Sequence, residues 1–140
     1  MDRPVSTRRV IVGVTGSLNS AGALTRAIRK ALERDAKLEI VQVVADGTDP
    51  KIALEKLDAF VSGVVPDGLG PGAHTCIEFG DPAKTLVRLT KGAELLVIGA
   101  QNHSHRMGIF SGDIVSFCIG HSYCPVDVCA NHEAEYPAAE

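Results

Sequence analysis

The residues best suited to bind a ligand form a polar loop between two apolar stretches, in the segment from Ile98 to Val115 (IGAQNHSHRMGIFSGDIV). Gly99 ends the first apolar run, and Gly112 opens an expected helix. Loops of this kind bind phosphates in many proteins, because the N–H groups at a helix N-terminus point toward the anion. Asp113, however, places a carboxylate where a phosphate needs a donor. The loop is therefore either a nucleotide site or the remnant of one.

The carboxylate of Asp113 opposes phosphate binding. Two like unit charges about 4 Å apart repel by about 1 kcal/mol in water and by about 4 kcal/mol at an effective dielectric constant of about 20. For a triphosphate this corresponds to a loss of affinity of roughly tenfold to a thousandfold. Aspartate also has a structural reason to be there, since it is a good N-cap and suits the positive end of a helix dipole. A Mg²⁺ ion between Asp113 and a phosphate would be one way to retain binding.

The apolar pattern predicts strands that alternate with helices along the whole chain. The predicted strands are Val10–Val14, Leu38–Ala45, Thr75–Phe79, Leu95–Gly99 and Pro125–Cys129. The predicted helices carry the apolar stripes Leu24, Ala27, Ile28, Ala31 and Leu32; Ile52, Leu54, Leu57, Phe60 and Val61; Leu86, Val87 and Leu89; and Ile114, Val115, Phe117, Cys118 and Ile119. This order indicates an α/β fold, a Rossmann-like parallel sheet of five strands with helices on both faces.

Two loops of unusual composition leave the carboxyl ends of predicted strands, one after Val14 and one after Ile98. In open parallel sheets, ligands bind outside the carboxyl ends of the strands where the strand order reverses. The fold and the loops therefore indicate the same site. The glycine-rich stretch VVPDGLGPGA neither ends a strand nor opens a helix, so a flexible connection is expected there.

Length and composition indicate one domain and exclude some functions. The 140 residues divide into a polar tail (1–8), a domain (9–130) and an acidic tail (131–140) that is expected to be disordered. The net charge of -3 offers no attraction to nucleic acid or to anionic lipid, and aromatic residues are only 4% of the chain. No apolar run reaches the roughly 20 residues of a membrane span, and no export signal is visible. A cytoplasmic protein is expected.

Metal and catalytic sites find little support in the sequence. The four cysteines are expected to be reduced, buried, small hydrophobic residues. A zinc site could be built from His103, His105, His121 and Cys124, but their spacing fits no standard pattern. No nucleophile elbow and no Walker A loop is present, so we expect no catalytic residues and no enzyme activity.

The sequence resembles the universal stress protein family over about residues 8 to 130. The resemblance rests on RRVIVGVTGS, FGDPAKTLVRL, LLVIGAQNHSHRMGIFSGDIVSFCIGHS and CPVDV. The family's nucleotide loop is glycine, two residues, glycine, nine residues, glycine, then serine or threonine. Here the spacing is kept, but Asn102 replaces the second glycine and Asp113 replaces the serine or threonine. Asn102 is a mild change, because asparagine tolerates positive φ better than most residues.

The resemblance implies an adenine nucleotide alpha hydrolase-like fold and a set of binding positions. Members that bind ATP usually carry an aspartate just after the first strand, where this chain has Thr15. Val43 matches a residue whose backbone faces the adenine. The implied cofactor-binding positions are Gly13, Val14, Thr15, Val43, Gly99, Asn102, Gly112, Asp113, Ile114 and Val115.

Three further loop residues could take part in binding or sensing. His103 and His105 could contact a phosphate when protonated, or could sense pH. Arg106 beside them could balance phosphate charge. The alternative for all three is an exposed, solvated side chain.

The resemblance also implies a homodimer through the last strand, Pro125–Cys129, paired antiparallel with its copy. Val126 and Val128 should lie on one face of that strand, with Asp127 and Cys129 on the other. A charge on an edge strand guards against pairing, and Asp127 opposite its own copy would repel. In a dimer we therefore expect Asp127 to be offset from its copy or to face water.

The sequence as a whole favours a non-catalytic stress-response module that signals or protects through unknown protein partners, with no cofactor expected. The alternative is a sensor that binds ATP or another adenine nucleotide, with Mg²⁺, and that could be a weak ATPase. The changes at Asp113 and Thr15 favour the first hypothesis. The retained spacing between Gly99 and Gly112 favours the second.

Overall fold

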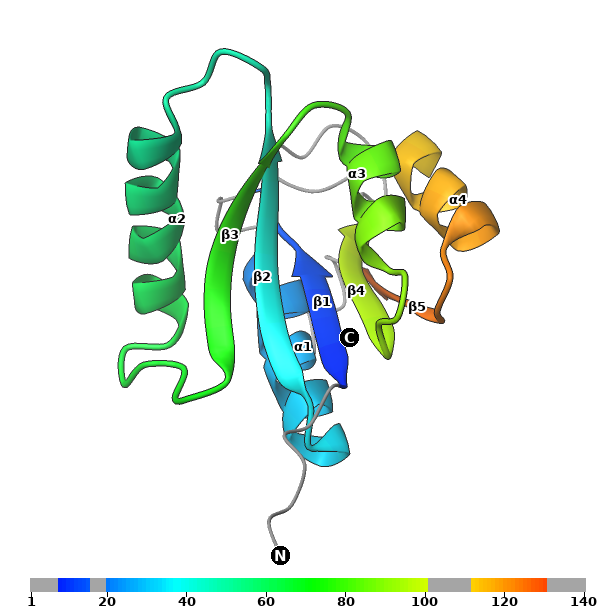
Figure 1. Ribbon diagram of the computed structural model, residues 1–140. Helices are drawn as coiled ribbons and strands as arrows, with labels where there is room; N and C mark the ends of the chain where they lie inside the picture. Colours follow the sequence, from blue (N-terminus) through cyan, green and yellow to red (C-terminus); the bar gives the residue numbers. More distant parts are fainter. Residues whose placement is uncertain (1–7, 16–19, 101–111, 131–140) are drawn as a thin grey trace, which may run out of the picture.

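The described residues form a parallel five-stranded sheet between two layers of helices (Figure 1). The structure is a computed structural model that describes residues 8–15, 20–100 and 112–130. The predictions for Asn102, His103, His105 and Arg106, and those for almost all of the two tails, lie outside these residues. The sheet order is β3-β2-β1-β4-β5, and every pair of neighbouring strands is parallel. The predicted fold class is confirmed.

Each predicted strand and helix is present, with bounds within two residues of the prediction for the strands. The strands are β1 (Arg9–Gly13), β2 (Lys37–Val44), β3 (Ala73–Phe79), β4 (Leu95–Ala100) and β5 (Val126–Ala130). The helices are α1 (Ala21–Arg34), α2 (Pro50–Val64), α3 (Pro82–Leu89) and α4 (Gly112–His121).

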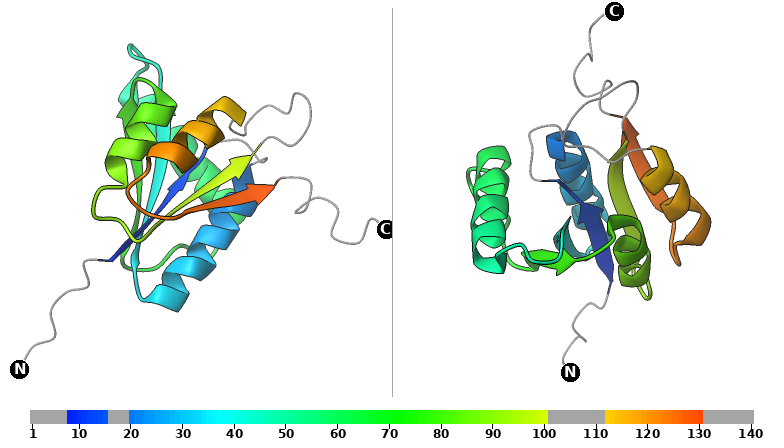
Figure 2. Two further views of the ribbon diagram at one scale, coloured as in Figure 1. Left: turned by 90° about the vertical axis from the view of Figure 1, so that its right-hand side faces the viewer. Right: turned by 90° about the horizontal axis from the view of Figure 1, so that it is seen from above.

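Helices lie on both faces of the sheet (Figure 2), and a hydrophobic core fills the space between helices and sheet on each face. Successive side chains of a strand point to opposite faces. Val10 and Val12 of β1 therefore pack with α1 and α2, whereas Ile11 packs with α3 and α4. These three side chains are fully buried, which explains why β1 is an unbroken apolar run rather than an alternating one.

The buried stripes of α1 and α2 are narrower than predicted. Leu32, Ile52 and Leu54 were expected in the apolar stripes, but they are 78%, 49% and 38% exposed. In α1 the buried face is formed by Leu24 and small residues, and Leu32 is turned about 100° from Ala31 toward solvent. In α2 the buried residues are Ala53, Leu57, Phe60 and Val61, because this helix packs mainly on the edge strand β3.

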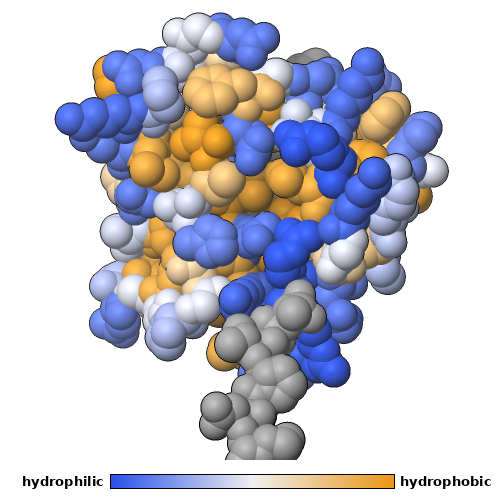
Figure 3. All heavy atoms as spheres, in the orientation of Figure 1, coloured by the Kyte–Doolittle hydropathy of each residue, from blue (hydrophilic) through white to orange (hydrophobic). Residues whose placement is uncertain are grey.

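The sheet face that carries α3 and α4 is only partly covered where β2 and β3 lie (Figure 1). Figure 3 shows hydrophobic side chains there, surrounded by hydrophilic ones. Ion pairs lie at this surface, with Arg9 Nη1 2.8 Å from Glu39 Oε1 and Arg88 Nη2 3.3 Å from Glu78 Oε1. Among the helices that the structure describes, none has both the length and the apolar composition needed to cross a bilayer.

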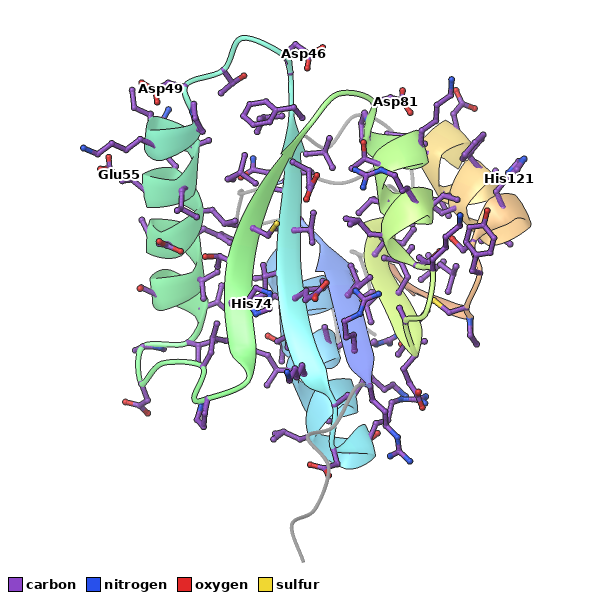
Figure 4. All side chains as sticks on the ribbon, viewed as in Figure 1. Asp46, Asp49, Glu55, His74, Asp81 and His121 are labelled. Atoms are coloured by element: carbon purple, nitrogen blue, oxygen red, sulfur yellow. The ribbon has the colours of Figure 1, made fainter. Side chains whose placement is uncertain are left out.

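Helix starts follow local sequence chemistry. Asp81 accepts a hydrogen bond from the Lys84 N–H (2.8 Å), and Pro82 follows at the first helical position, as predicted. Asp49 caps α2 in the same way through the Lys51 N–H (2.9 Å). Figure 4 shows both aspartates at the starts of their helices.

Replacement of the α3 cap should destabilise the fold measurably. We expect Asp81→Ala to lower the free energy of unfolding by about 1 kcal/mol, because the Lys84 N–H loses its acceptor. Urea denaturation followed by circular dichroism measures the change. The control is Glu55→Ala, on the exposed side of α2, which should stay within about 0.5 kcal/mol of the wild type. Equal stability of the Asp81 variant and the wild type would contradict the cap.

Candidate functional site

The candidate site lies at the carboxyl edge of the sheet, where the strand order reverses. The chain moves from β1 to β2 and β3 on one side, then crosses to β4 and β5 on the other. β1 and β4 are neighbours, with Gly13 opposite Ile98. The carboxyl ends of these two strands therefore lie side by side. This is the position at which open parallel sheets bind ligands.

Several of the predicted site residues meet at this edge. Gly13 ends β1, and the Val14 N–H donates to the Val41 carbonyl oxygen (2.9 Å). Gly99 lies in β4 opposite Cys129, and Val43 lies near the end of β2. These residues therefore lie at or near the carboxyl ends of β1, β4 and β2. Asn102, in the loop between β4 and α4, lies outside the described residues.

The first turn of α4 completes the described part of the site. It contains Gly112, Asp113, Ile114 and Val115. Val115 is buried in one cluster with Ile11 and Ile98, so this turn packs against the two central strands. The N-terminus of α4 thus lies where the sequence placed a phosphate-binding or anion-binding position.

Asp113 lies within the first turn of α4 rather than before it. The sequence offered two structural reasons for an aspartate at this position, namely capping and the helix dipole. Helix α4 begins at Gly112, and the exposed carboxylate of Asp113 lies at the positive end of the helix dipole, which stabilises an anion there.

Thr15 is held by two residues that the sequence analysis did not single out. The Thr15 N–H donates to Ser20 Oγ (3.1 Å), and the Thr15 and Ser20 hydroxyl oxygens are 3.0 Å apart. Gln42 Nε2 donates to the Thr15 carbonyl oxygen (3.0 Å). These bonds tie the end of β1 to the start of α1 and to β2.

Ser20 and Gln42 carried signals that could have been noticed. Ser20 occupies the N-cap position of α1 and is 3% exposed, yet its side chain makes no capping bond and turns back to Thr15. Gln42 is a polar residue inside the apolar run of β2. A buried or partly buried polar side chain needs a partner, and both of these side chains hydrogen-bond with Thr15.

The described part of the proposed zinc set does not form a metal site. His121 Nδ1 is 2.9 Å from the Phe117 carbonyl oxygen, and the two rings stack with centroids 4.0 Å apart. Within the described ranges, no group of three or more histidine, cysteine, aspartate or glutamate residues could hold a metal ion. His103 and His105 are not among the described residues.

The edge strand β5 has the predicted faces, and its charged residue forms an ion pair that the sequence did not indicate. Val126 and Val128 pack toward α4, and Cys129 packs toward α1. Asp127 Oδ1 lies 2.8 Å from Arg26 Nη1 of α1, so its charge is paired within the chain. The expectation that Asp127 is offset from its copy or faces water applies to a dimer and stays a prediction.

Comparison with known proteins gives the same family by two routes, a family model and curated relatives. A sequence model of the universal stress protein family matches residues 6–129. Universal stress protein Rv3134c of Mycobacterium tuberculosis is 27% identical over an alignment 143 residues long, which covers 96% of this chain and 53% of that protein. The chain thus spans about half the length of the curated relatives it matches.

Solved structures show the same fold. Universal stress protein UspA from Lactobacillus plantarum is 25% identical with a TM-score of 0.63, and the match covers 90% of this chain and 99% of that one. The universal stress protein from Archaeoglobus fulgidus in complex with dAMP is 21% identical with a TM-score of 0.63, and the match covers 89% and 98% of the two chains.

The packing of α4, which positions Asp113, can be tested through Cys118. Cys118 is fully buried, and this burial raises the pKa of its thiol to about 11. At about pH 8 we expect iodoacetamide to leave Cys118 of the native protein unmodified but to alkylate it in urea, because only the thiolate reacts. Timed alkylation followed by peptide mass spectrometry measures the difference. Equal rates in the two conditions would show that α4 does not pack on the sheet.

The same thiol gives a prediction about pH. Its folded-state pKa lies above the ordinary value of 9.0, so the unfolded chain ionises first. The stability that depends on this thiol is present below about pH 9 and is lost as the pH rises toward 11. Cys118→Ala should remove that part of the alkaline loss, as denaturation at several pH values would show.

Proposed function

Because the chain belongs to the universal stress protein family, we propose that it is a non-catalytic module of the stress response that acts through contacts with other proteins and has a degenerate nucleotide loop. The observation that carries the proposal is that Thr15 is hydrogen-bonded within the chain. Its hydroxyl lies 3.0 Å from the Ser20 hydroxyl, and its carbonyl oxygen accepts a bond from Gln42. The position at which the resemblance implies an aspartate for adenosine is thus occupied by a neutral side chain engaged within the chain.

Asp113 adds repulsion at the other end of the site. Its exposed carboxylate lies in the first turn of α4, where a family serine or threonine would donate to phosphate. A carboxylate offers no hydrogen for such a bond, and it repels every phosphate charge within a few ångströms. Loss of the donor and gain of an anion act together against a triphosphate.

The absence of catalysis is part of the proposal. Hydrolysis of a phosphoanhydride needs a group that positions or deprotonates the attacking water. Of the described residues assigned to this site, Asp113 alone has an ionisable side chain. The same carboxylate would have to tolerate the phosphate and act as a base, which is an unfavourable combination.

The second candidate function is an adenine-nucleotide sensor. It is favoured by the geometry that remains, namely the glycine-bearing ends of β1 and β4 beside the N-terminus of α4. The relative from Archaeoglobus fulgidus was solved in complex with dAMP, a monophosphate with fewer charges than ATP. A nucleotide of that kind would meet less repulsion from Asp113.

Calorimetric titration distinguishes the two functions. We expect no binding heat from wild-type protein with ATP, with or without Mg²⁺. The Asp113→Ser variant should bind ATP measurably and at least about tenfold more tightly than the wild type, because a hydrogen-bond donor replaces the repelling charge. The control is Asp81→Ser, which removes a carboxylate from the start of another helix and should gain nothing. Thr15→Asp combined with Asp113→Ser should bind more tightly than Asp113→Ser alone. Micromolar binding of ATP or dAMP by the wild type would favour the sensor.

We also propose a homodimer through the outer edge of β5. β5 is the last strand of the sheet and pairs on one side with β4. The ion pair between Arg26 and Asp127 offsets the charge that would otherwise oppose strand pairing.

The ion pair gives the dimer a specific test. Arg26→Ala should weaken dimerisation, because it leaves the Asp127 charge unpaired at the edge strand. The control is Arg29→Ala, an exposed arginine of the same helix. Sedimentation equilibrium measures the dissociation constant of each variant. A monomeric wild type, or an equal effect of the two variants, would contradict this interface.

A further inference from the structure

A groove between α3 and α4 combines positive charge with aromatic side chains. It has a volume of about 280 Å³, and none of its lining residues belongs to the candidate site described above. Its walls include Lys84, Arg88 and Lys91 from α3 and its end, and Phe117, His121 and Tyr123 from α4 and the turn after it. Figure 4 shows His121 pointing away from the sheet on α4.

The positive charge of the groove is only partly neutralised. Arg88 contacts Glu78 at 3.3 Å. Asp81 is the nearest acidic residue in sequence to Lys84, but its carboxylate accepts a bond from the backbone N–H of Lys84 and caps the helix. Within the described residues, neither Lys84 nor Lys91 forms an ion pair. This is notable in a chain whose net charge is -3.

Hydrogen bonds fix the position of Tyr123 on the aromatic side of the groove. Buried Thr90 links the two sides, since its hydroxyl donates to the Val87 carbonyl oxygen (2.6 Å) and accepts from the Tyr123 N–H (3.0 Å). Lys91 Nζ lies 5.4 Å from the centre of the Tyr123 ring. Tyr123 is nevertheless 61% exposed. A ring that is fixed through its backbone and still open to solvent is well placed to contact a ligand.

The spacing of the cations indicates the shape of the occupant. Lys84, Arg88 and Lys91 follow one another at helical intervals along one side of α3 and its end, so the row is about 10 Å long. A single carboxylate or phosphate cannot reach all three. An extended peptide places alternate side chains about 7 Å apart, which lets two or three acidic side chains face the row while an aromatic one reaches Tyr123.

We propose that this groove binds an extended acidic segment of a partner protein, with glutamate or aspartate side chains along α3 and an aromatic side chain against Phe117, His121 and Tyr123. The inference adds to the proposed function, because it supplies a surface for contacts with other proteins. It does not depend on whether the loop after β4 binds a nucleotide, so the two can fail separately.

Fluorescence anisotropy with a labelled peptide tests the proposal. The probe is Gly-Glu-Tyr-Glu-Phe-Glu-Gly, and the matched peptide has glutamine in place of each glutamate. We expect the acidic peptide to bind and the glutamine peptide to bind at least about tenfold more weakly, with affinity falling as salt is added. Inorganic phosphate at the same ionic strength should not compete beyond the effect of sodium chloride. Equal binding of the two peptides, or full displacement by phosphate, would overturn the proposal.

Variants locate the binding on the molecule. The double substitution Lys84→Gln and Lys91→Gln should lower the affinity for the acidic peptide at least about tenfold, since it removes both cations that form no ion pair. The control is Lys51→Gln with Lys56→Gln on α2, which makes the same change of charge on the opposite helix layer. Tyr123→Ser should weaken binding without any change of charge. An equal loss of peptide affinity in the α2 variant would show that net charge alone attracts the peptide and would overturn the assignment to this groove. Circular dichroism verifies that each variant is folded.

Discussion

The structure depends on the burial of β1 and β4 between two layers of helices. Ile11, Leu96 and Ile98 have no exposed surface, and a central parallel strand that is covered on both sides must be apolar throughout. Polar groups can therefore enter the centre of the sheet only where these strands end. Within the sheet, that constraint leaves the strand ends as the places for polar groups, and at the carboxyl ends β1 and β4 lie side by side.

The way in which the chain satisfies its own polar groups at this edge bears directly on function. Burial of Ser20 requires a partner for its hydroxyl, and that partner is Thr15. Gln42 reaches the same residue from β2. A site whose polar atoms already bind one another has less to offer a ligand. The α3–α4 groove shows the opposite condition, with cations and an exposed ring that find few partners within the chain.

Much of this architecture could be predicted from the sequence, since the β-branched runs and the Asp81–Pro82 start are local signals. The exposure of Leu32 and Leu54 could not, because the buried width of a helix depends on which strands it covers. The ion pair between Asp127 and Arg26 joins residues far apart in the chain, so it could not be predicted from either residue type. The same is true of the bonds of Thr15 to Ser20 and Gln42, which decide how the candidate site is interpreted.

The central claim is that the edge where β1 and β4 end no longer binds a nucleotide. The most direct test is a titration of ¹⁵N-labelled protein with ATP and Mg²⁺, followed through the amide signals of Gly13, Thr15 and Gly99. Our account predicts that these signals stay in place at about 1 mM nucleotide, as expected when the dissociation constant is at least of the order of 10 mM. A saturable shift of all three signals at micromolar nucleotide would contradict it and would identify the protein as a nucleotide sensor.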